Sequence, residues 1–330
     1  MPWAVATLAR AVDAHRPHVI VARSNVPIAL ARALAMRRVG LRVVFDADGL
    51  PHDERIEDSG DIDARYCISR FVEMAGVMRS SSTLVRSTQG RDILQHRVGP
   101  ANDPKRLFVA PNGRDPSIFR IAHPSDRARL RERFGVDDGP LGVYVGSLGP
   151  KYMPDWIRAF VASFLRTHGG SRFVVATGHV EVARQAFGSL TDGPSPGLTI
   201  VTLPPHEVPD LLAAADVGLA FVRPSFSTRA VSPIKVGEYL LAGCPVLATA
   251  GVGDLDSWAP QSDGALELIC DPRAAAMVER PTAGRARELI MQRARAAGLR
   301  WFSLDRTVAA YQQAIQAALM DPRGAADRDS

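Results

Sequence analysis

The stretch Ser-Pro-Ile-Lys-Val-Gly-Glu-Tyr-Leu-Leu-Ala-Gly-Cys-Pro-Val, residues 232–246, predicts a helix followed by a buried strand. Ser232 and Pro233 form a helix start, because a Ser hydroxyl accepts a first-turn N–H and Pro has no N–H to leave unpaired there. We therefore expect the helix to begin at Pro233. Gly243 is expected to end the helix, and the apolar run from Pro245 is typical of a strand.

Lys235 stands at the third position of this helix, where a capping box would have Glu or Gln. A cation beside the positive end of a helix dipole costs about 0.3–1 kcal/mol unless an anion lies opposite. Main-chain N–H groups and the dipole favour negative charge at that end, so a Lys above it indicates a phosphate site. Glu238 shares a helix face with Lys235, and the alternative interpretation is a solvated surface pair.

The composition of the basic residues supports the interpretation of Lys235 as part of a phosphate site. Only Lys105, Lys151 and Lys235 among the 40 basic residues are lysines, which leaves 37 arginines. In a chain so rich in Arg, a retained Lys suggests a site that needs a compact point charge.

Composition narrows the class of protein. A chain of 330 residues, with 46% apolar and 23% charged residues, is expected to form two globular domains. It has no run of 18 apolar residues and no signal-peptide pattern, which predicts a location in the cytoplasm, either free or at the inner face of the membrane. The net charge of +5 is spread along the chain and suits anionic substrates or an anionic membrane surface better than nucleic acid. The three cysteines lack metal or redox spacing, and we expect each to pack as a small apolar side chain.

Strand-like runs alternate with helical patterns through the whole chain, which indicates βαβ units and parallel sheets. In the first half we expect strands at 18–22, 42–45, 83–86 and 107–110, and helices at 2–15, 26–38, 64–79 and 91–97. In the second half we expect strands from 142 and at 172–177, 198–201, 217–221, 245–249 and 265–269, and helices at 125–133, 155–168, 209–214, 282–298 and 304–320.

The turn-rich stretch Pro111–Pro116 is the best candidate for a domain boundary. We predict an α/β protein with a domain at 1–115, a second at 116–302, and a terminal helix and frayed tail at 303–330. Both domains are expected to be Rossmann-like, doubly wound parallel sheets whose carboxyl strand ends face each other across a cleft.

Several loops are predicted to follow carboxyl strand ends. Gly146 and Gly149 follow one strand, and glycines there let a backbone approach a phosphate closely. Lys151 lies in the same loop and is as well explained as a solvated Lys. Gly178 ends another strand, and His179 beside it has no partner at metal-ligand spacing.

The polar loop at residues 46–55 also follows a strand, in the first domain. Its acidic residues fit a ligand site at a carboxyl strand end and fit equally well turn formers and helix starters.

With these residues in view, the sequence resembles the GT-B fold glycosyltransferases of family 4, also called glycosyl transferases group 1. The quoted stretch 232–246, the preceding Leu-Leu-Ala-Ala-Ala-Asp-Val-Gly-Leu-Ala, the strand and loop 144–149 and the passage 111–119 occur in the order of that family's nucleotide-sugar domain. The resemblance covers most of residues 17–320 and is stronger in the second half.

The resemblance implies an enzyme of class EC 2.4, hexosyltransferase-like, that transfers a sugar from a nucleotide diphosphate sugar. The family usually retains the anomeric configuration, needs no metal or other cofactor, and contributes to cell-envelope polysaccharides. The acceptor is a sugar, a lipid-linked molecule or a small molecule. By resemblance Lys235 and Asp48 are the catalytic candidates, with Lys235 on the diphosphate. The implied substrate-binding residues are Gly146, Ser147, Lys151, Gly178, Leu203, Val208, Arg223, Ser232, Pro233, Ile234 and Glu238.

Individual positions have separate implied roles. Glu238 matches the second Glu of the family's Glu-x7-Glu motif and would bind ribose. Gly146 and Ser147 would lie against the phosphates, and the turn 203–208 against the base.

The chain departs from the family pattern in three ways. The first Glu of the motif is replaced by Ala230, and the basic residue after the strand-end glycine is replaced by Ser147. The family also has several strands before anything like residues 17–45, so we expect the first domain to be incomplete. Two alternatives therefore stand beside a transferase: a catalytically silent or partner-dependent subunit, and a GT-B sugar-nucleotide epimerase.

Overall fold

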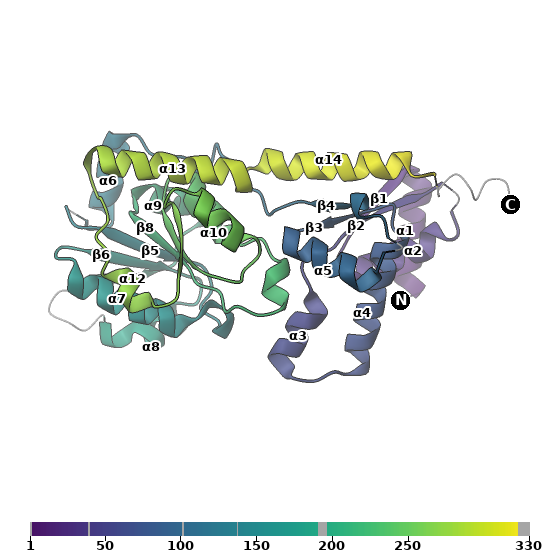
Figure 1. Ribbon diagram of the computed structural model, residues 1–330, viewed down its shortest axis with the longest axis horizontal. Coiled ribbons are helices and arrows are strands. Elements are labelled where there is room, and N and C mark those ends of the chain that lie inside the picture. The colour runs from purple at the N-terminus through teal and green to yellow at the C-terminus, as the bar shows by residue number, and fades with distance from the viewer. Residues whose placement is uncertain (1, 39, 101, 137, 191–196, 323–330) are drawn as a thin grey trace. The chain divides into compact units, whose positions relative to one another are not determined.

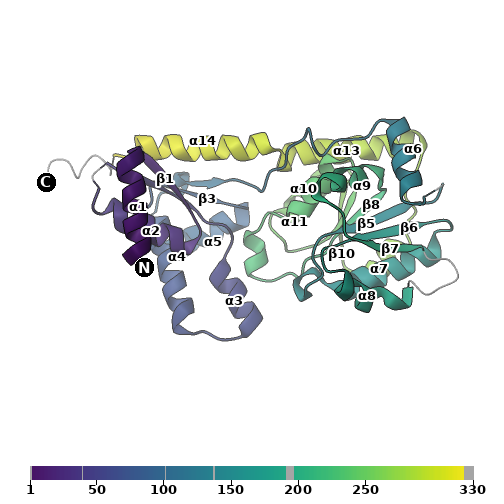
Figure 2. The ribbon, with the colours of Figure 1, turned by 180° about the vertical axis from the view of Figure 1, so that it is seen from behind.

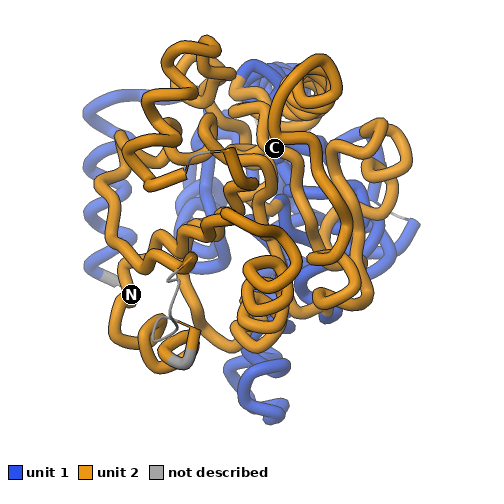
Figure 3. Tube along the Cα trace, turned by 90° about the vertical axis from the view of Figure 1, so that its left-hand side faces the viewer, with its two compact units in different colours: residues 1–111, 225–232, 305–330 blue, residues 112–224, 233–304 orange. Residues whose placement is uncertain are grey.

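The computed structural model describes residues 2–38, 40–100, 102–136, 138–190 and 197–322. The chain forms two compact units, which are coloured separately in Figure 3. Unit 1 contains residues 1–111, 225–232 and 305–330, and unit 2 contains residues 112–224 and 233–304.

Unit 1 is built on a four-stranded parallel sheet in the order β1-β2-β3-β4. Its strands are β1 (Val19–Arg23), β2 (Arg42–Asp46), β3 (Ser82–Val85) and β4 (Leu107–Val109). Its helices are α1 (Pro2–His15), α2 (Asn25–Ala35), α3 (Pro51–Ser59), α4 (Ala64–Arg79), α5 (Thr88–Val98) and the part of α14 (Leu304–Met320) from Asp305 onward. Figure 2 shows α1 and α2 beside one another near β1.

The strand order of unit 1 decides which helices cover each face of its sheet. Right-handed crossovers between strands in sequential order place the connecting helices on one face. A core on that face includes Ile28 of α2, Phe45 of β2 and Leu94 of α5. Because the described strands advance in one direction, this sheet has no reversal of strand order, in contrast to the doubly wound sheet that we expected for the first domain.

The other face of the unit 1 sheet is covered by α14 (Figure 1). Ala310, Ala314 and Ala318 recur every four residues and form one small-residue stripe, which packs on Val44 and Leu84. Ser82 Oγ donates a hydrogen bond of 2.7 Å to the Ala314 carbonyl. The bounds that the sequence predicts for α14 are correct. The prediction placed this helix in a separate terminal segment, whereas α14 completes the core of unit 1.

Unit 2 is built on a six-stranded parallel sheet in the order β10-β9-β8-β5-β6-β7. Its strands are β5 (Leu141–Val145), β6 (Arg172–Ala176), β7 (Leu198–Val201), β8 (Val217–Ala220), β9 (Val246–Thr249) and β10 (Leu266–Ile269). Its helices are α6 (Pro124–Arg133), α7 (Pro154–Thr167), α8 (Val180–Phe187), α9 (Val208–Ala214), α10 (Ile234–Leu241), α11 (Leu255–Trp258), α12 (Pro272–Ala276) and α13 (Gly284–Phe302). Counted from β5, this is the Rossmann order 3-2-1-4-5-6, so the doubly wound prediction is confirmed for unit 2.

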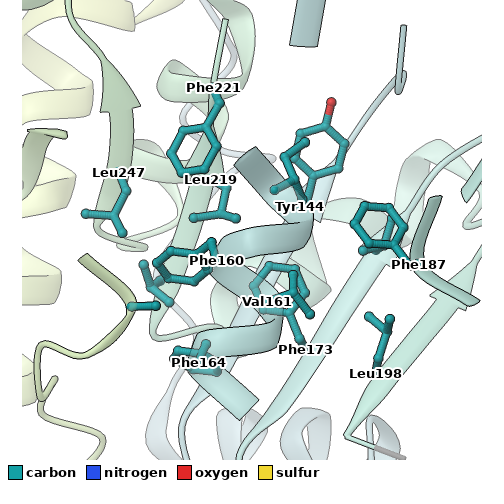
Figure 4. Close-up of a cluster of buried hydrophobic side chains, with 14 of the residues drawn as sticks. Tyr144, Phe160, Val161, Phe164, Phe173, Phe187, Leu198, Leu219, Phe221 and Leu247 are labelled. Atoms are coloured by element: carbon teal, nitrogen blue, oxygen red, sulfur yellow. The ribbon is translucent and has the colours of Figure 1, made fainter. Parts of the chain in front are cut away.

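The core of unit 2 is aromatic on the α7 side of its sheet (Figure 4). Phe160 and Phe164 of α7 stack with ring centroids 5.6 Å apart, and both meet Phe173 of β6 edge-on. These rings are fully or almost fully buried, and offset and edge-on pairs add about 0.5–1.5 kcal/mol each beyond burial. They fix the sheet from which the strand-end loops project.

The predicted strands and long helices all occur, most within one or two residues of their expected bounds. Four short helices, α3, α8, α11 and α12, were not predicted. Part of the polar loop 46–55 is helical, because Pro51 starts α3 with Asp53 and Glu54 in its first turn.

The expectation for the cysteines is confirmed only in part. Cys244 is buried, whereas Cys67 and Cys270 are exposed. The segment 225–232 groups with unit 1, although the predicted boundaries place it in the second domain.

Candidate functional site

The order of strands in unit 2 reverses between β5 and β8, and this is where open α/β sheets bind ligands. All six strands are parallel, so their carboxyl ends share one edge of the sheet. Gly146 follows β5 at that edge, and α10 follows β8 after a loop. The switch point therefore brings Gly146 and Lys235 together.

Position 146 requires a glycine for two reasons, its backbone conformation and the close approach of Lys235. Its φ is +131°, in a region that favours glycine, and its N–H donates to the Ala176 carbonyl at 2.9 Å. A Cβ at this position would lie 2.5 Å from Lys235 Cε. Any larger residue would displace the lysine, so Gly146 makes room for the Lys235 side chain.

Lys235 lies between two tyrosine rings rather than in open solvent. Its Nζ donates to Tyr144 Oη at 2.8 Å and lies 4.3 Å from the Tyr144 ring centroid and 3.9 Å from that of Tyr152. Burial lowers the pKa of the Lys235 amine to about 7, although Glu238 opposes this effect. The amine forms no ion pair among the described residues, so its charge remains available to an anion.

Glu238 has a different partner from the one that the helix spacing suggests. One of its carboxylate oxygens accepts a hydrogen bond from Arg114 Nε at 2.8 Å, and the Glu238 side chain is 17% exposed. Burial raises the pKa of Glu238, against the effects of Arg114 and Lys235. The interpretation of Lys235 and Glu238 as a solvated surface pair is therefore wrong.

The start of α10 differs from the prediction by one residue. The helix begins at Ile234, and Pro233 is the N-cap with φ −73° and ψ 108°. The N-cap position therefore falls one residue after the predicted Ser232, and the Pro233 side chain makes no capping hydrogen bond. Ser232 is buried and belongs to the segment grouped with unit 1. Lys235 becomes the second residue of the helix and stays within the first turn, where the dipole acts.

The remaining predicted donor-site residues of unit 2 lie on strand ends along the same edge of the sheet. Ser147 is exposed, and its carbonyl accepts a hydrogen bond from Tyr144 Oη. The Lys151 carbonyl accepts a hydrogen bond of 2.8 Å from the N–H of Arg223, which ties the loop after β5 to the loop after β8. Gly178 is exposed just beyond β6.

Leu203 and Val208 bracket the turn between β7 and α9, and both are partly buried. This turn follows the outermost strand at one side of the sheet, two strands from β5.

The sequence did not identify three residues that define the lysine site: Tyr144, Tyr152 and Arg114. Each lies in a stretch whose glycines or turn residues dominate the local pattern, and no local pattern distinguishes a tyrosine that faces a lysine about 90 positions away. Burial raises the pKa of Tyr144, so its hydroxyl stays protonated and donates to the Ser147 carbonyl.

Asp48, the second catalytic candidate, lies beyond β2 in unit 1 and is held by two arginines. Its carboxylate accepts hydrogen bonds from Arg23 Nη2 at 2.6 Å and Arg86 Nε at 2.8 Å. Burial raises the pKa of Asp48, but the hydrogen bonds from Arg86 and Arg23 outweigh it, and the net pKa is lowered. Asp48 is therefore a poor proton acceptor and a stable anion.

Arg86 also joins Asp46, whose other oxygen accepts a hydrogen bond from Tyr311 of α14. Asp48 thus belongs to a network that ties β2, β3 and α14 of unit 1 together.

Ala230, which replaces the first Glu of the family motif, is 3% exposed and belongs to the segment grouped with unit 1. Its Cβ packs against the helix α5, and a Cβ added at Gly90 would lie 3.1 Å from it. A carboxylate would be desolvated at this position, which explains physically why a small apolar residue occupies it.

Within the described residues, no group of three or more His, Cys, Asp or Glu side chains is arranged to hold a metal ion. None of the helices in the described ranges combines the length and apolar character that crossing a membrane requires.

Comparison with known proteins finds similarity in both sequence and structure. No protein-family model matches the chain. A D-inositol 3-phosphate glycosyltransferase of Acidothermus cellulolyticus is 35% identical over 106 residues, which are 31% of this chain and 22% of that protein. The match therefore spans about a fifth of the relative's length.

Solved structures match nearly the whole chain. HepE from Anabaena, crystallised with UDP, has a TM-score of 0.68 and 17% identity over 94% of this chain and 80% of that one. A glycosyltransferase of Rickettsia africae has a TM-score of 0.73 and 12% identity over 96% and 81% of the two chains. At such identities, the likeness establishes the fold.

Proposed function

Because the chain has the GT-B fold of glycosyltransferases, we propose that it transfers a sugar from a nucleotide diphosphate sugar to an acceptor. The observation that carries the proposal is the Lys235 amine, which lies at the switch point of unit 2 without an ion-pair partner among the described residues. The partial match to an inositol phosphate glycosyltransferase supports the same reaction class.

In this proposal the first turn of α10 and Lys235 bind the diphosphate. Sugar transfer leaves negative charge on the departing nucleoside diphosphate, and a preorganised cation at a helix start stabilises that charge. Gly146 and Ser147 lie against the phosphates, with Lys151, Arg223, Gly178, Pro233 and Ile234 around them. Ser232 is proposed to contribute only by positioning the stretch of chain that leads into α10.

Glu238 is proposed to bind the ribose hydroxyls, with Arg114 holding its carboxylate in place. The turn from Leu203 to Val208 takes the base. We infer retention of anomeric configuration from the family resemblance alone.

Asp48 is proposed to act as an anion that orders Arg23 and Arg86 for an acceptor, because its lowered pKa disfavours general-base chemistry. The acceptor is a sugar, a lipid-linked molecule or a small molecule. Three expectations stay predictions: a cleft between the two domains, a location of the chain at a membrane face, and activity without a cofactor.

The donor site is tested by isothermal titration of UDP and other nucleoside diphosphates into the protein and its Lys235→Ala variant. We expect Lys235→Ala to weaken binding by at least tenfold, because it removes the cation from the helix start. Lys105→Ala, at an exposed lysine of unit 1, is the matched control and should leave binding unchanged. Equal effects of the two changes would refute the assignment of Lys235.

The reaction class is tested with a panel of nucleotide sugars. A transferase releases nucleoside diphosphate in the presence of an acceptor, an epimerase converts the donor into its epimer, and a silent subunit binds without turnover. Chromatography of the nucleotide products separates these three outcomes, and only the first supports the proposal.

A further inference from the structure

We propose that unit 1 carries a second binding site, for a phosphorylated sugar or polyol, in a pocket of about 460 Å³. The residues that line the pocket belong to α3, α4, α5 and the segment 225–232, all within unit 1; Figure 1 labels the three helices. Its volume falls in the range of small-molecule sites and exceeds what a bare phosphate fills. The residues that carry the argument are Arg70, Gln89, Asp92, Arg97, Phe226 and Arg229.

Arg97 forms a fixed base for the pocket. Its Nη2 donates to both oxygens of Asp53 at 2.8 and 2.9 Å, and its Nη1 donates to Glu73 at 2.8 Å. The Arg97 side chain is only 5% exposed, and the carboxylates of Asp53 and Glu73 together outweigh its single positive charge. Arg97 therefore shapes the pocket and does not supply its positive charge.

Arg70 and Arg229 supply the positive charge. Arg70 Nη1 donates to Tyr66 Oη at 2.7 Å, and Arg229 Nε donates to Gln89 Oε1 at 2.9 Å. Both partners are neutral, and neither arginine forms an ion pair within the described residues, unlike Arg23, Arg86 and Arg97 of the same unit. Two guanidinium groups without an ion-pair partner among the described residues suit a phosphate at one pocket, because their forked donors match its oxygens.

The rest of the pocket fits a carbon skeleton with hydroxyl groups. Phe226 is 44% exposed, and the Cζ atoms of Arg97 and Arg229 lie 5.5 and 5.7 Å from its ring centroid. The ring supplies apolar surface and fixes the Arg229 guanidinium. Gln89 and Asp92 from α5 add hydrogen-bonding groups for hydroxyls, and Arg91 at 3.0 Å balances the Asp92 charge.

The segment that carries Phe226 and Arg229 is itself anchored. Ser87 Oγ donates to the Arg229 carbonyl at 2.7 Å, and the Ser227 N–H donates to Glu57 at 2.8 Å. A site whose side chains are held before the ligand arrives loses less entropy on binding. Because every contact named here lies in unit 1, the inference does not rest on the proposed donor site.

The test is isothermal titration of glucose 6-phosphate and myo-inositol 1-phosphate into the full chain, with the unphosphorylated compounds alongside. We expect at least one phosphate ester to bind saturably, and its unphosphorylated parent to bind at least tenfold more weakly. Arg70→Gln and Arg229→Gln should each weaken binding of that ester by at least tenfold. Added salt should weaken binding as well, because ions screen a charge interaction.

Arg65→Gln is the matched control, since Arg65 is an exposed arginine of α4 that does not line the pocket. It should leave binding unchanged, as should Lys235→Ala, and circular dichroism checks that each variant is folded. The proposal is overturned by no binding of either ester, by unchanged affinity in the folded Arg70→Gln/Arg229→Gln double variant, or by loss of binding in Lys235→Ala. The last result would place the ester in the donor site instead.

Discussion

At the scale of single residues, the lysine site is governed by what surrounds one amine. Burial beside two tyrosine rings desolvates Lys235, and the charge of Glu238 offsets this only in part, so the pKa of the amine falls to about 7. An arriving diphosphate supplies an anion and favours the ammonium form. The protonation state of this lysine and nucleotide binding are therefore linked.

This linkage predicts that nucleoside diphosphate affinity falls as the pH rises above about 7. The empty protein loses the Lys235 proton there, whereas the complex must retain it, so each pH unit weakens binding by up to about tenfold. Titrations between pH 7.5 and 9.5, where the ligand phosphates are already ionised, measure this slope.

The Lys235→Met variant has no amine to protonate and serves as the reference for that slope. It should bind weakly at every pH, with no decline over the same range. A decline of equal slope in this variant would show that another group is responsible.

At the scale of elements, the buried carboxylate of Asp216 holds helices and strands of unit 2 together. Asp216 precedes β8 and accepts hydrogen bonds from Arg127 and Arg131 of α6 at 2.5 and 2.8 Å, and from Arg287 of α13 at 2.9 Å. It also accepts the N–H of Leu141 at the start of β5. The Asp216 side chain is fully buried, so this anion fixes two helices to the central strands.

Asp216→Asn should destabilise unit 2 by about 3–5 kcal/mol, because it leaves the buried guanidinium groups of Arg131 and Arg287 and the partly buried one of Arg127 without their counter-ion. Urea unfolding followed by fluorescence of Trp258 and Trp301, which stack within this unit, measures the change. Asp126→Asn removes an exposed pair with Arg129 and should cost less than about 1 kcal/mol. Similar costs for the two variants would contradict the central role of Asp216.

At the scale of the whole molecule, each unit is assembled from separate stretches of chain. Unit 1 takes its sheet from residues before 112, an anchored segment at 225–232 and the helix α14. The alanine stripe of α14 covers one face of that sheet, and Tyr311 hydrogen bonds to Asp46. Without α14, Val44 and Leu84 would face water.

A chain that ends at Leu304 should therefore lose the fold of unit 1 while unit 2 persists. Hydrogen exchange followed by mass spectrometry should show loss of protection in β2 and β3, with β5 and β6 still protected. A chain that ends at Pro322 keeps α14 whole and is the control. Continued protection of β3 in the shorter chain would show that the sheet does not depend on α14.

Much of the fold could be predicted from local patterns. Apolar runs, turn residues and the 3.6-residue period gave most of the strands and long helices, including α4 and α14 at their observed bounds. Short helices such as α3 were missed, because Asp53 and Glu54 are equally typical of a polar loop and of a helix first turn.

The sequence by itself determined the alternation of strands and helices, the Gly146 turn and the placement of Lys235 in the first turn of a helix, because these depend on residues near one another in the chain. Only the tertiary structure decided that Lys235 lies between Tyr144 and Tyr152, that Glu238 pairs with Arg114, and that α14 returns to the first sheet. The physical reason is that strand order and packing bring distant residues together, and a local pattern of side chains contains no information on which distant neighbour will fill the space beside it.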